Sequence, residues 1–179
     1  MSSTLPHDFE EILTAEAAPE GVLERLVARV GEVLKADRCF LYVRRPDEGK
    51  GRIMFCWRRD ESVPDVTQPD WQPDTTGLPD EDPLFRAALT GRLSVYVDDV
   101  ETAPPTVLNL AFERRTFGHR ALIHAHAQEA GTLWGILQPA MFGKPRHWTD
   151  ADRALIEMIL PRLVDVLKRR PDQPARPAA

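Results

Sequence analysis

The chain has few cysteines and no long apolar run, and both shortages restrict its class. Only two of its 179 residues are cysteine, Cys39 and Cys56, and they fall on different predicted strands. The chain does not open with the basic start and apolar run of a secretion signal. Because disulfides form mainly in secreted proteins, two reduced thiols are favoured over a disulfide. No window approaches the roughly 18 apolar residues that a membrane-spanning helix needs. We therefore expect a cytoplasmic protein without a membrane partner.

Motifs of catalysis and phosphate binding are absent as well. The sequence contains no glycine-rich phosphate loop, no Cys-X-X-Cys pair and no Ser-His-Asp order at a recognisable elbow. Charged residues make up 28% of the chain and the net charge is -5, with neither sign concentrated. Nucleic acid is therefore not expected as a partner, and a role other than catalysis is favoured.

What the chain does contain fits one domain of ordinary size, because 42% of its residues are hydrophobic. We expect a lead-in segment over residues 1–19 with a short helix, a domain over residues 20–170, and a disordered tail over residues 171–179. The tail, PDQPARPAA, has no residue that could join a core.

Apolar residues at helical spacing predict two long terminal helices. They run from about Glu20 to Lys35 and from about Thr149 to Arg170, and the Thr149 hydroxyl can cap the second. Two shorter helices are predicted over Pro83–Thr90, capped by Asp82 or Glu81, and over Thr106–Thr116.

Five strands are predicted from aromatic and aliphatic content. They cover Cys39–Arg44, Gly51–Arg58, Leu93–Val97, His119–Ala127 and Thr132–Gln138, the last one stopping at Pro139. The first two and the last two read as hairpins, which indicates an antiparallel sheet.

Two strands have informative faces. On the strand Gly51–Arg58, simple alternation places Ile53, Phe55 and Trp57 on one face. On the strand His119–Ala127, it places His124 and His126 together with Leu122, away from a small apolar face that suits packed helices. The histidine face is therefore expected on the pocket side of the sheet. A metal there would need further ligands, and the sequence shows none at an interpretable spacing, so no metal is expected.

The segment from Arg59 to Pro83 carries five prolines among many acids. Such a density of proline predicts that no regular element forms there. Trp71 and Leu78 could pin the segment to the body of the domain. Long loops of this kind are functional or solvated, so a pocket lid and a solvated excursion both stay open.

Several short motifs together resemble a known family. Leu133-Trp134-Gly135, Pro145-Arg146-His147-Trp148 and the helix start before Leu155 and Ile156 resemble the final third of a GAF domain. Ala36-Asp37-Arg38 before Cys39-Phe40-Leu41-Tyr42-Val43 resembles its first strand. The likeness is closest to the phytochrome and cyanobacteriochrome branch. It implies an α/β (α+β) fold, with a central antiparallel sheet of about five or six strands, terminal helices on one face and a pocket on the other.

The same resemblance implies that no bilin is attached covalently. That branch attaches its bilin through a cysteine followed by histidine, about nine residues before the equivalent of Phe117-Gly118, where a thiolate is required. This chain has Asn109 and Leu110 there. Asp37-Arg38-Cys39-Phe40 matches a cyanobacteriochrome motif in letters but opens the first strand, so a buried core thiol is favoured.

The resemblance implies a stand-alone GAF regulatory or sensor module that binds an unidentified small molecule without a covalent bond. It would signal through protein contacts, either as a homodimer through its terminal helices or with a protein partner. The candidate ligand-binding residues, chosen by predicted face and polarity, are Trp57, Tyr96, Phe117, His124, His126 and Gln138.

Two alternatives stay open. The first is an adaptor whose pocket is filled by its own side chains. The second is a reductase acting on methionine sulfoxide, an activity that the GAF fold also supports. It ranks last because such enzymes need reactive cysteines in loops around the pocket, and both thiols here lie on predicted strands.

Overall fold

The computed structural model describes residues 4–172, so most of the predicted tail lies outside the described residues. The described chain contains one six-stranded antiparallel sheet with the strand order β3-β2-β1-β6-β5-β4. The strands are β1 (Arg38–Arg45), β2 (Lys50–Arg58), β3 (Gln72–Pro73), β4 (Val95–Val97), β5 (Ala121–Glu129) and β6 (Thr132–Met141). The antiparallel sheet predicted from the sequence is thus confirmed.

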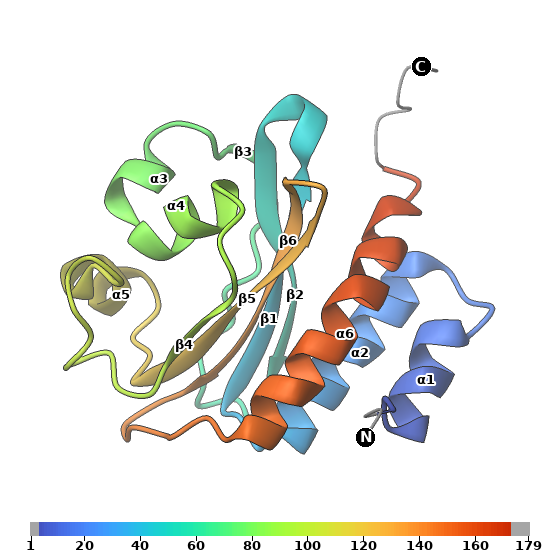
Figure 1. Ribbon diagram of the computed structural model, residues 1–179, viewed down its shortest axis with the longest axis horizontal. Coiled ribbons are helices and arrows are strands. Elements are labelled where there is room, and N and C mark those ends of the chain that lie inside the picture. Colours follow the sequence, from blue (N-terminus) through green and yellow to red (C-terminus); the bar gives the residue numbers. More distant parts are fainter. Residues whose placement is uncertain (1–3, 173–179) are drawn as a thin grey trace.

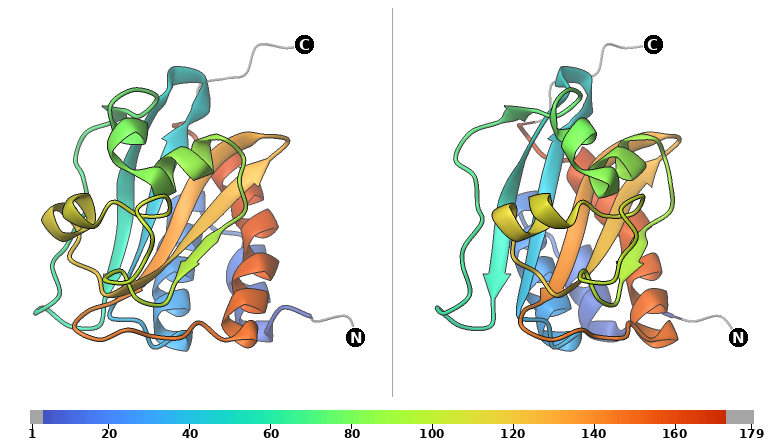
Figure 2. Two further views of the ribbon diagram at one scale, coloured as in Figure 1. Left: turned by 60° about the vertical axis from the view of Figure 1, so that its left-hand side comes forward. Right: turned by 90° about the vertical axis from the view of Figure 1, so that its left-hand side faces the viewer.

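Helices cover both faces of this sheet, in two separate groups (Figures 1 and 2). One face carries α1 (His7–Thr14), α2 (Pro19–Val33) and α6 (Asp150–Lys168). The other lies under the short helices α3 (Leu78–Glu81), α4 (Pro83–Leu89) and α5 (Leu110–Thr116). Among the described helices, none combines the length and apolar character needed to cross a membrane.

The main core lies between the sheet and the terminal helices. The small apolar side of β5, Ala121, Ile123, Ala125 and Ala127, is fully buried there, which lets α6 pack closely. Trp148 is also fully buried, and its Nε1 donates to the carbonyl oxygen of Val97 at 3.1 Å. The large buried surface of the Trp148 side chain and the hydrogen bond of its indole N–H together anchor the start of α6 to the sheet.

Both cysteines are free thiols, and Cys39 is fully buried in this core. Trp134 is 5% exposed and belongs to the same core. The buried core position predicted for Cys39 is therefore confirmed.

The strand β6 continues past Pro139, where the sequence predicted its end. Proline lacks only the amide hydrogen, and the carbonyl groups that follow still pair. Ala140 O accepts from the amide of Asp37 at 3.0 Å, and Met141 O accepts from the amide of Arg120 at 2.7 Å. The predicted stop was wrong because neighbours on both sides hold the strand extended.

The segment before α5 also differs from the prediction. The side chain of Asn109 accepts a hydrogen bond from the amide of Phe112 at 3.2 Å and caps the helix, so α5 begins at Leu110 rather than at Thr106. The Asp82 cap of α4 is present as predicted, with Oδ1 accepting from the amide of Leu84 at 3.0 Å.

The proline-rich segment is ordered against the domain, contrary to the prediction that no regular element forms. It contains β3 and α3. Its anchor is Asp74, which is fully buried and accepts from Arg44 Nε at 2.7 Å and Nη2 at 2.8 Å. Trp71 adds a second anchor, because the guanidinium group of Arg45 lies 4.2 Å from its ring centroid. A bidentate buried ion pair and a stacked cation outweigh the weak local propensity.

Candidate functional site

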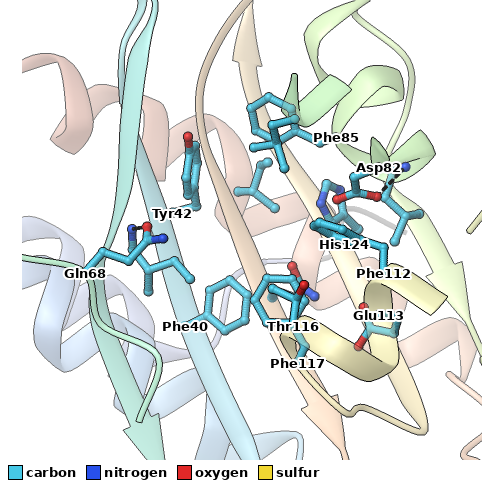
Figure 3. Close-up of a pocket in the computed structure, with 15 residues that line it drawn as sticks. Phe40, Tyr42, Gln68, Asp82, Phe85, Phe112, Glu113, Thr116, Phe117 and His124 are labelled. Carbon is cyan, nitrogen blue, oxygen red and sulfur yellow. Dashed lines mark hydrogen bonds between the residues drawn. The ribbon is translucent and has the colours of Figure 1, made fainter. Parts of the chain in front are cut away.

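A cavity of about 110 Å³ lies between the sheet and the short helices α3, α4 and α5 (Figure 3). Its walls are mainly aromatic and aliphatic. Its lining consists of Phe40, Tyr42, Ile53, Gln68, Leu78, Asp82, Leu84, Phe85, Phe112, Glu113, Thr116, Phe117, His124, Ile136 and Gln138. An apolar cavity with a few convergent polar groups is the usual form of a small-molecule site.

Aromatic rings form one flat wall of this cavity. Phe40 from β1 and Phe117 after α5 are stacked, with ring centroids 5.5 Å apart. The ring of His119 lies nearly parallel to that of Phe117, with ring centroids 5.4 Å apart and an interplanar angle of 5°. Tyr42 and Phe85 meet edge to face at 5.5 Å. The stacked rings hold one another in place, so the wall is a preformed flat surface.

Behind this wall, two buried residues, Arg38 and His119, fix the position of the Glu113 carboxylate. Arg38 Nη2 lies 2.6 Å from His119 Nε2. A guanidinium group can only donate, so Nε2 must accept and the ring proton must sit on Nδ1. His119 Nδ1 lies 2.8 Å from Glu113 Oε1, and the His119 amide donates to the same oxygen at 3.1 Å. Burial lowers the pKa of His119, which favours this neutral form.

Glu113 therefore enters the cavity wall as a carboxylate with one oxygen already occupied. Glu113 is only 3% exposed. Arg38 is fully buried on the far side of His119 from Glu113. The positive charge of Arg38 balances that carboxylate through the neutral imidazole without entering the lining itself.

The two histidines of β5 form a second fixed chain. His126 Nδ1 lies 2.7 Å from the carbonyl oxygen of Arg92, which can only accept, so His126 Nδ1 carries a proton. His126 Nε2 then accepts from His124 Nδ1 at 2.8 Å. Burial lowers the pKa of both rings, and His126 lowers that of His124 further. The neutral His124 ring therefore presents an unprotonated Nε2.

Asp82 is the third buried acid–base group of the cavity. One of its oxygens caps α4, and the residue is 8% exposed. Burial raises the pKa of Asp82 to about 6. The hydrogen bond from the Leu84 amide opposes this rise, and the charge of Glu113 adds to it. Asp82 therefore changes protonation near neutral pH, unlike an ordinary surface aspartate.

The structure brings three of the six predicted site residues to the cavity: Phe117, His124 and Gln138. His126 does not line it but is bonded to His124, and it borders a separate groove between β5 and α6. The other two, Trp57 and Tyr96, lie on the opposite face of the sheet.

Trp57 was misplaced because β2 contains a bulge. The ladder pairs Leu41 with Phe55 but Tyr42 with Ile53, so one extra residue, Met54, interrupts the alternation. Ile53 lines the cavity, whereas Trp57 packs against Gly31 of α2 on the helix face. A one-residue insertion moves every later side chain to the other face.

Tyr96 was misplaced because the register of β4 against β5 is a tertiary property. Tyr96 pairs with Ile123, whose side chain faces the terminal helices. Its hydroxyl donates to Glu157 Oε1 at 3.0 Å, and the guanidinium group of Arg153 lies 4.3 Å from its ring centroid. Tyr96 therefore fastens α6 to the sheet.

Sequence reasoning missed most of the remaining lining. Phe40 and Tyr42 carried a usable signal, because alternation along β1 places them opposite the core residues Cys39 and Leu41. Asp82 was noted only as a helix cap. Glu113 gave no signal, since it reads as an exposed residue of a short amphipathic helix.

A family model for the GAF domain matches residues 18–163 of the chain. The chain belongs to the GAF family. This GAF domain has the six-stranded antiparallel sheet of that fold, so the family and the fold class predicted from the sequence are confirmed. No protein of curated function matches the chain significantly.

Solved GAF domains superpose over most of their lengths. A phycoerythrobilin-bound GAF domain from a cyanobacterial phytochrome has a TM-score of 0.71 at 18% identity, covering 92% of this chain and 96% of that one. The GAF domain of a phosphoenolpyruvate-protein phosphotransferase from Coxiella burnetii has a TM-score of 0.68 at 17% identity, with coverages of 90% and 89%.

A third similar structure is the photoproduct state of a GAF domain from Synechocystis. It has a TM-score of 0.63 at 26% identity and covers 84% of this chain and 94% of that one. The similar structures thus include GAF domains from a bilin-bound phytochrome and from a phosphotransferase.

The raised pKa of Asp82 predicts how the stability of this GAF domain depends on pH. Between pH 4 and 6 the folded state holds the proton more tightly than the unfolded state, whose aspartate titrates near 3.8. This residue's contribution to the free energy of unfolding should therefore fall as the pH rises through that window. A shift of about two pKa units corresponds to at most about 3 kcal/mol.

Asp82→Asn should abolish this fall while keeping the cap on α4, because asparagine caps helices as well as aspartate does. The measurement is urea unfolding of both proteins at pH 4.5 and pH 7.5, with the exposed Asp80→Asn as the control. If the difference between wild type and Asp82→Asn were the same at both pH values, Asp82 would have an ordinary pKa.

Proposed function

We propose that this protein is a cytoplasmic sensor that binds a small molecule without a covalent bond in the cavity under α3, α4 and α5. The GAF family consists of sensor and regulatory modules, which sets the general role. The finer proposal is supported by the cavity itself. It combines a flat aromatic wall with buried polar groups, Asp82, Glu113 and His124, that retain unused hydrogen-bonding capacity.

The cavity volume supports a ligand of about one small ring. About 110 Å³ is comparable with the engineered cavity of about 150 Å³ that takes up benzene. Non-covalent binding is supported by the lining, because no cysteine is among the residues that line the cavity. Asn109, at the position where the related branch attaches its bilin, uses its side chain to cap α5.

The route of the signal is part of the same proposal. The cavity wall includes side chains of α4 and α5, which cover the sheet on the face away from the terminal helices. His124 of β5 lines the cavity, and the alanine face of the same strand packs against α6. A ligand that shifts β5 would therefore act on α6, where a second copy or another protein could contact the domain.

One observation favours the adaptor alternative, in which the domain only binds proteins. The cavity is small, since its aromatic side chains fill much of the space between the sheet and the short helices. The reductase alternative has no such support. Burial raises the pKa of both Cys39 and Cys56, whereas a nucleophilic cysteine needs a lowered one.

Native mass spectrometry with an absorption spectrum, on protein purified from its own source, tests the proposal. We expect one small molecule retained per chain. Gln138→Leu, which removes a polar group of the lining, should lose it, and Tyr96→Phe on the opposite face should keep it. A ligand-free dimer or a ligand-free complex with another protein would favour the adaptor instead.

A further inference from the structure

The polar groups of the cavity are mostly hydrogen-bond acceptors. His124 offers an unprotonated Nε2, because its Nδ1 donates to His126. Glu113 offers its second oxygen, because Oε1 is occupied by His119. Asp82 offers the acceptor capacity of its carboxylate that the amides of Leu84 and Phe85 leave unused. Three acceptors from three separate elements thus border one small space (Figure 3).

Strong donors are missing from the same lining. Among the residues that line the cavity, there is no lysine, arginine or tryptophan. The Tyr42 hydroxyl donates to Asp74 Oδ2 at 3.1 Å and is therefore engaged away from the cavity. The donors that remain belong to neutral groups, the amides of Gln68 and Gln138 and the hydroxyl of Thr116.

We propose that the cavity selects a small planar nitrogen compound that carries several N–H donors and no negative charge, of the amidine or amino-heterocycle class. This inference rests on the proposed small-molecule function and specifies the ligand for that site. The stacked pair of Phe40 and Phe117 accommodates the flat ring, and the acceptors of Asp82, Glu113 and His124 receive its N–H groups.

An anionic ligand would be disfavoured on two grounds. It would bring a like charge next to the buried carboxylate of Glu113, and it would leave the acceptors of the lining without donors. Arg38 does not reverse this preference, because its guanidinium group donates to His119 and to the carbonyl oxygen of Pro64 instead of entering the cavity.

Three probes of nearly equal shape test the proposal: benzamidinium, benzoate and toluene. We expect benzamidinium to bind at least about tenfold more tightly than benzoate in calorimetric titrations, since one charge-assisted hydrogen bond contributes at least as much as a tenfold change in affinity requires. Glu113→Gln keeps the acceptor for His119 but removes the charge, and Asp82→Asn keeps the helix cap. Each should weaken benzamidinium about tenfold, for the same reason, and leave toluene unchanged.

Asp80→Asn is the matched control, because Asp80 is exposed on α3 and lies outside the lining. Circular dichroism and melting temperature confirm that each variant is folded before titration. Nitrogen NMR of the free protein provides a second readout, in which His124 should carry its proton on Nδ1. A proton on Nε2 would remove one acceptor and overturn the assignment.

The outcomes separate this inference from the proposed function. If benzoate binds as tightly as benzamidinium, or toluene alone binds, the cavity takes up small molecules but the donor preference is wrong. If none of the probes binds and xenon also fails to enter, the site is closed and both proposals fail. Tight benzamidinium binding that is unaffected by Glu113→Gln and Asp82→Asn would place the probe elsewhere and refute the inference.

Discussion

Asp74→Ala is expected to lower the free energy of unfolding by about 3–5 kcal/mol, the usual cost of removing one partner of a buried ion pair. Asp74 is fully buried and accepts two hydrogen bonds from Arg44 and one from Tyr42. Truncation removes these bonds from the Arg44 guanidinium group, which stays buried and keeps its bond to Leu133 O at 3.1 Å.

The same substitution should loosen the segment of residues 59–83, because Asp74 ties it to the sheet. Gln68 and Leu78 of that segment line the cavity, so ligand binding should weaken along with stability. Urea unfolding measures the loss of stability, and limited proteolysis measures the loosening of the segment. Asp70→Ala, an exposed acid in the same segment, is the control and should change neither.

Asp74→Asn tests whether charge or hydrogen bonding matters more. Asparagine keeps one acceptor for Arg44 but not the charge, so the loss should be smaller than for alanine. A loss below about 1 kcal/mol for Asp74→Ala would mean that this ion pair contributes no more than a surface one.

Gly135→Ala should destabilise the domain by about 3 kcal/mol, at the upper end for overpacking in a core. A Cβ atom at Gly135 would lie 2.7 Å from the carbonyl oxygen of Tyr42 and 3.0 Å from Leu167 Cδ1. The first neighbour is backbone of β1, paired with β6 in the middle of the sheet, and cannot turn aside as a flexible side chain would.

Gly21→Ala is the matched control for this prediction. Gly21 lies in α2, and a Cβ there would meet nothing within 4 Å. Alanine favours helix over glycine by about 1 kcal/mol, so this variant should be slightly more stable than the wild type. Chemical denaturation of both variants measures the contrast. Equal stability of the two variants would show that β1 and β6 can move apart without cost.

Local and long-range features of this chain differ in how far the sequence predicts them. Features set by local periodicity were predicted well: the terminal helices, the two hairpins, and the face on which His124 lies all follow from spacing along a single element. Features set by neighbouring strands were not. The bulge at Met54 and the pairing of Tyr96 with Ile123 depend on partners distant in sequence, and each placed a predicted site residue on the wrong face.

The sequence by itself determined the family, the order of the principal elements and the position of the pocket on the face away from the terminal helices. Only the tertiary structure decided the chemistry of that pocket. Glu113 becomes a buried acceptor because Arg38 of β1 and His119, just before β5, approach it. His124 is fixed as an acceptor through His126, whose Nδ1 is held by the carbonyl group of Arg92, 34 residues from His126. Protonation states follow from such long-range contacts, which no local pattern in the chain encodes.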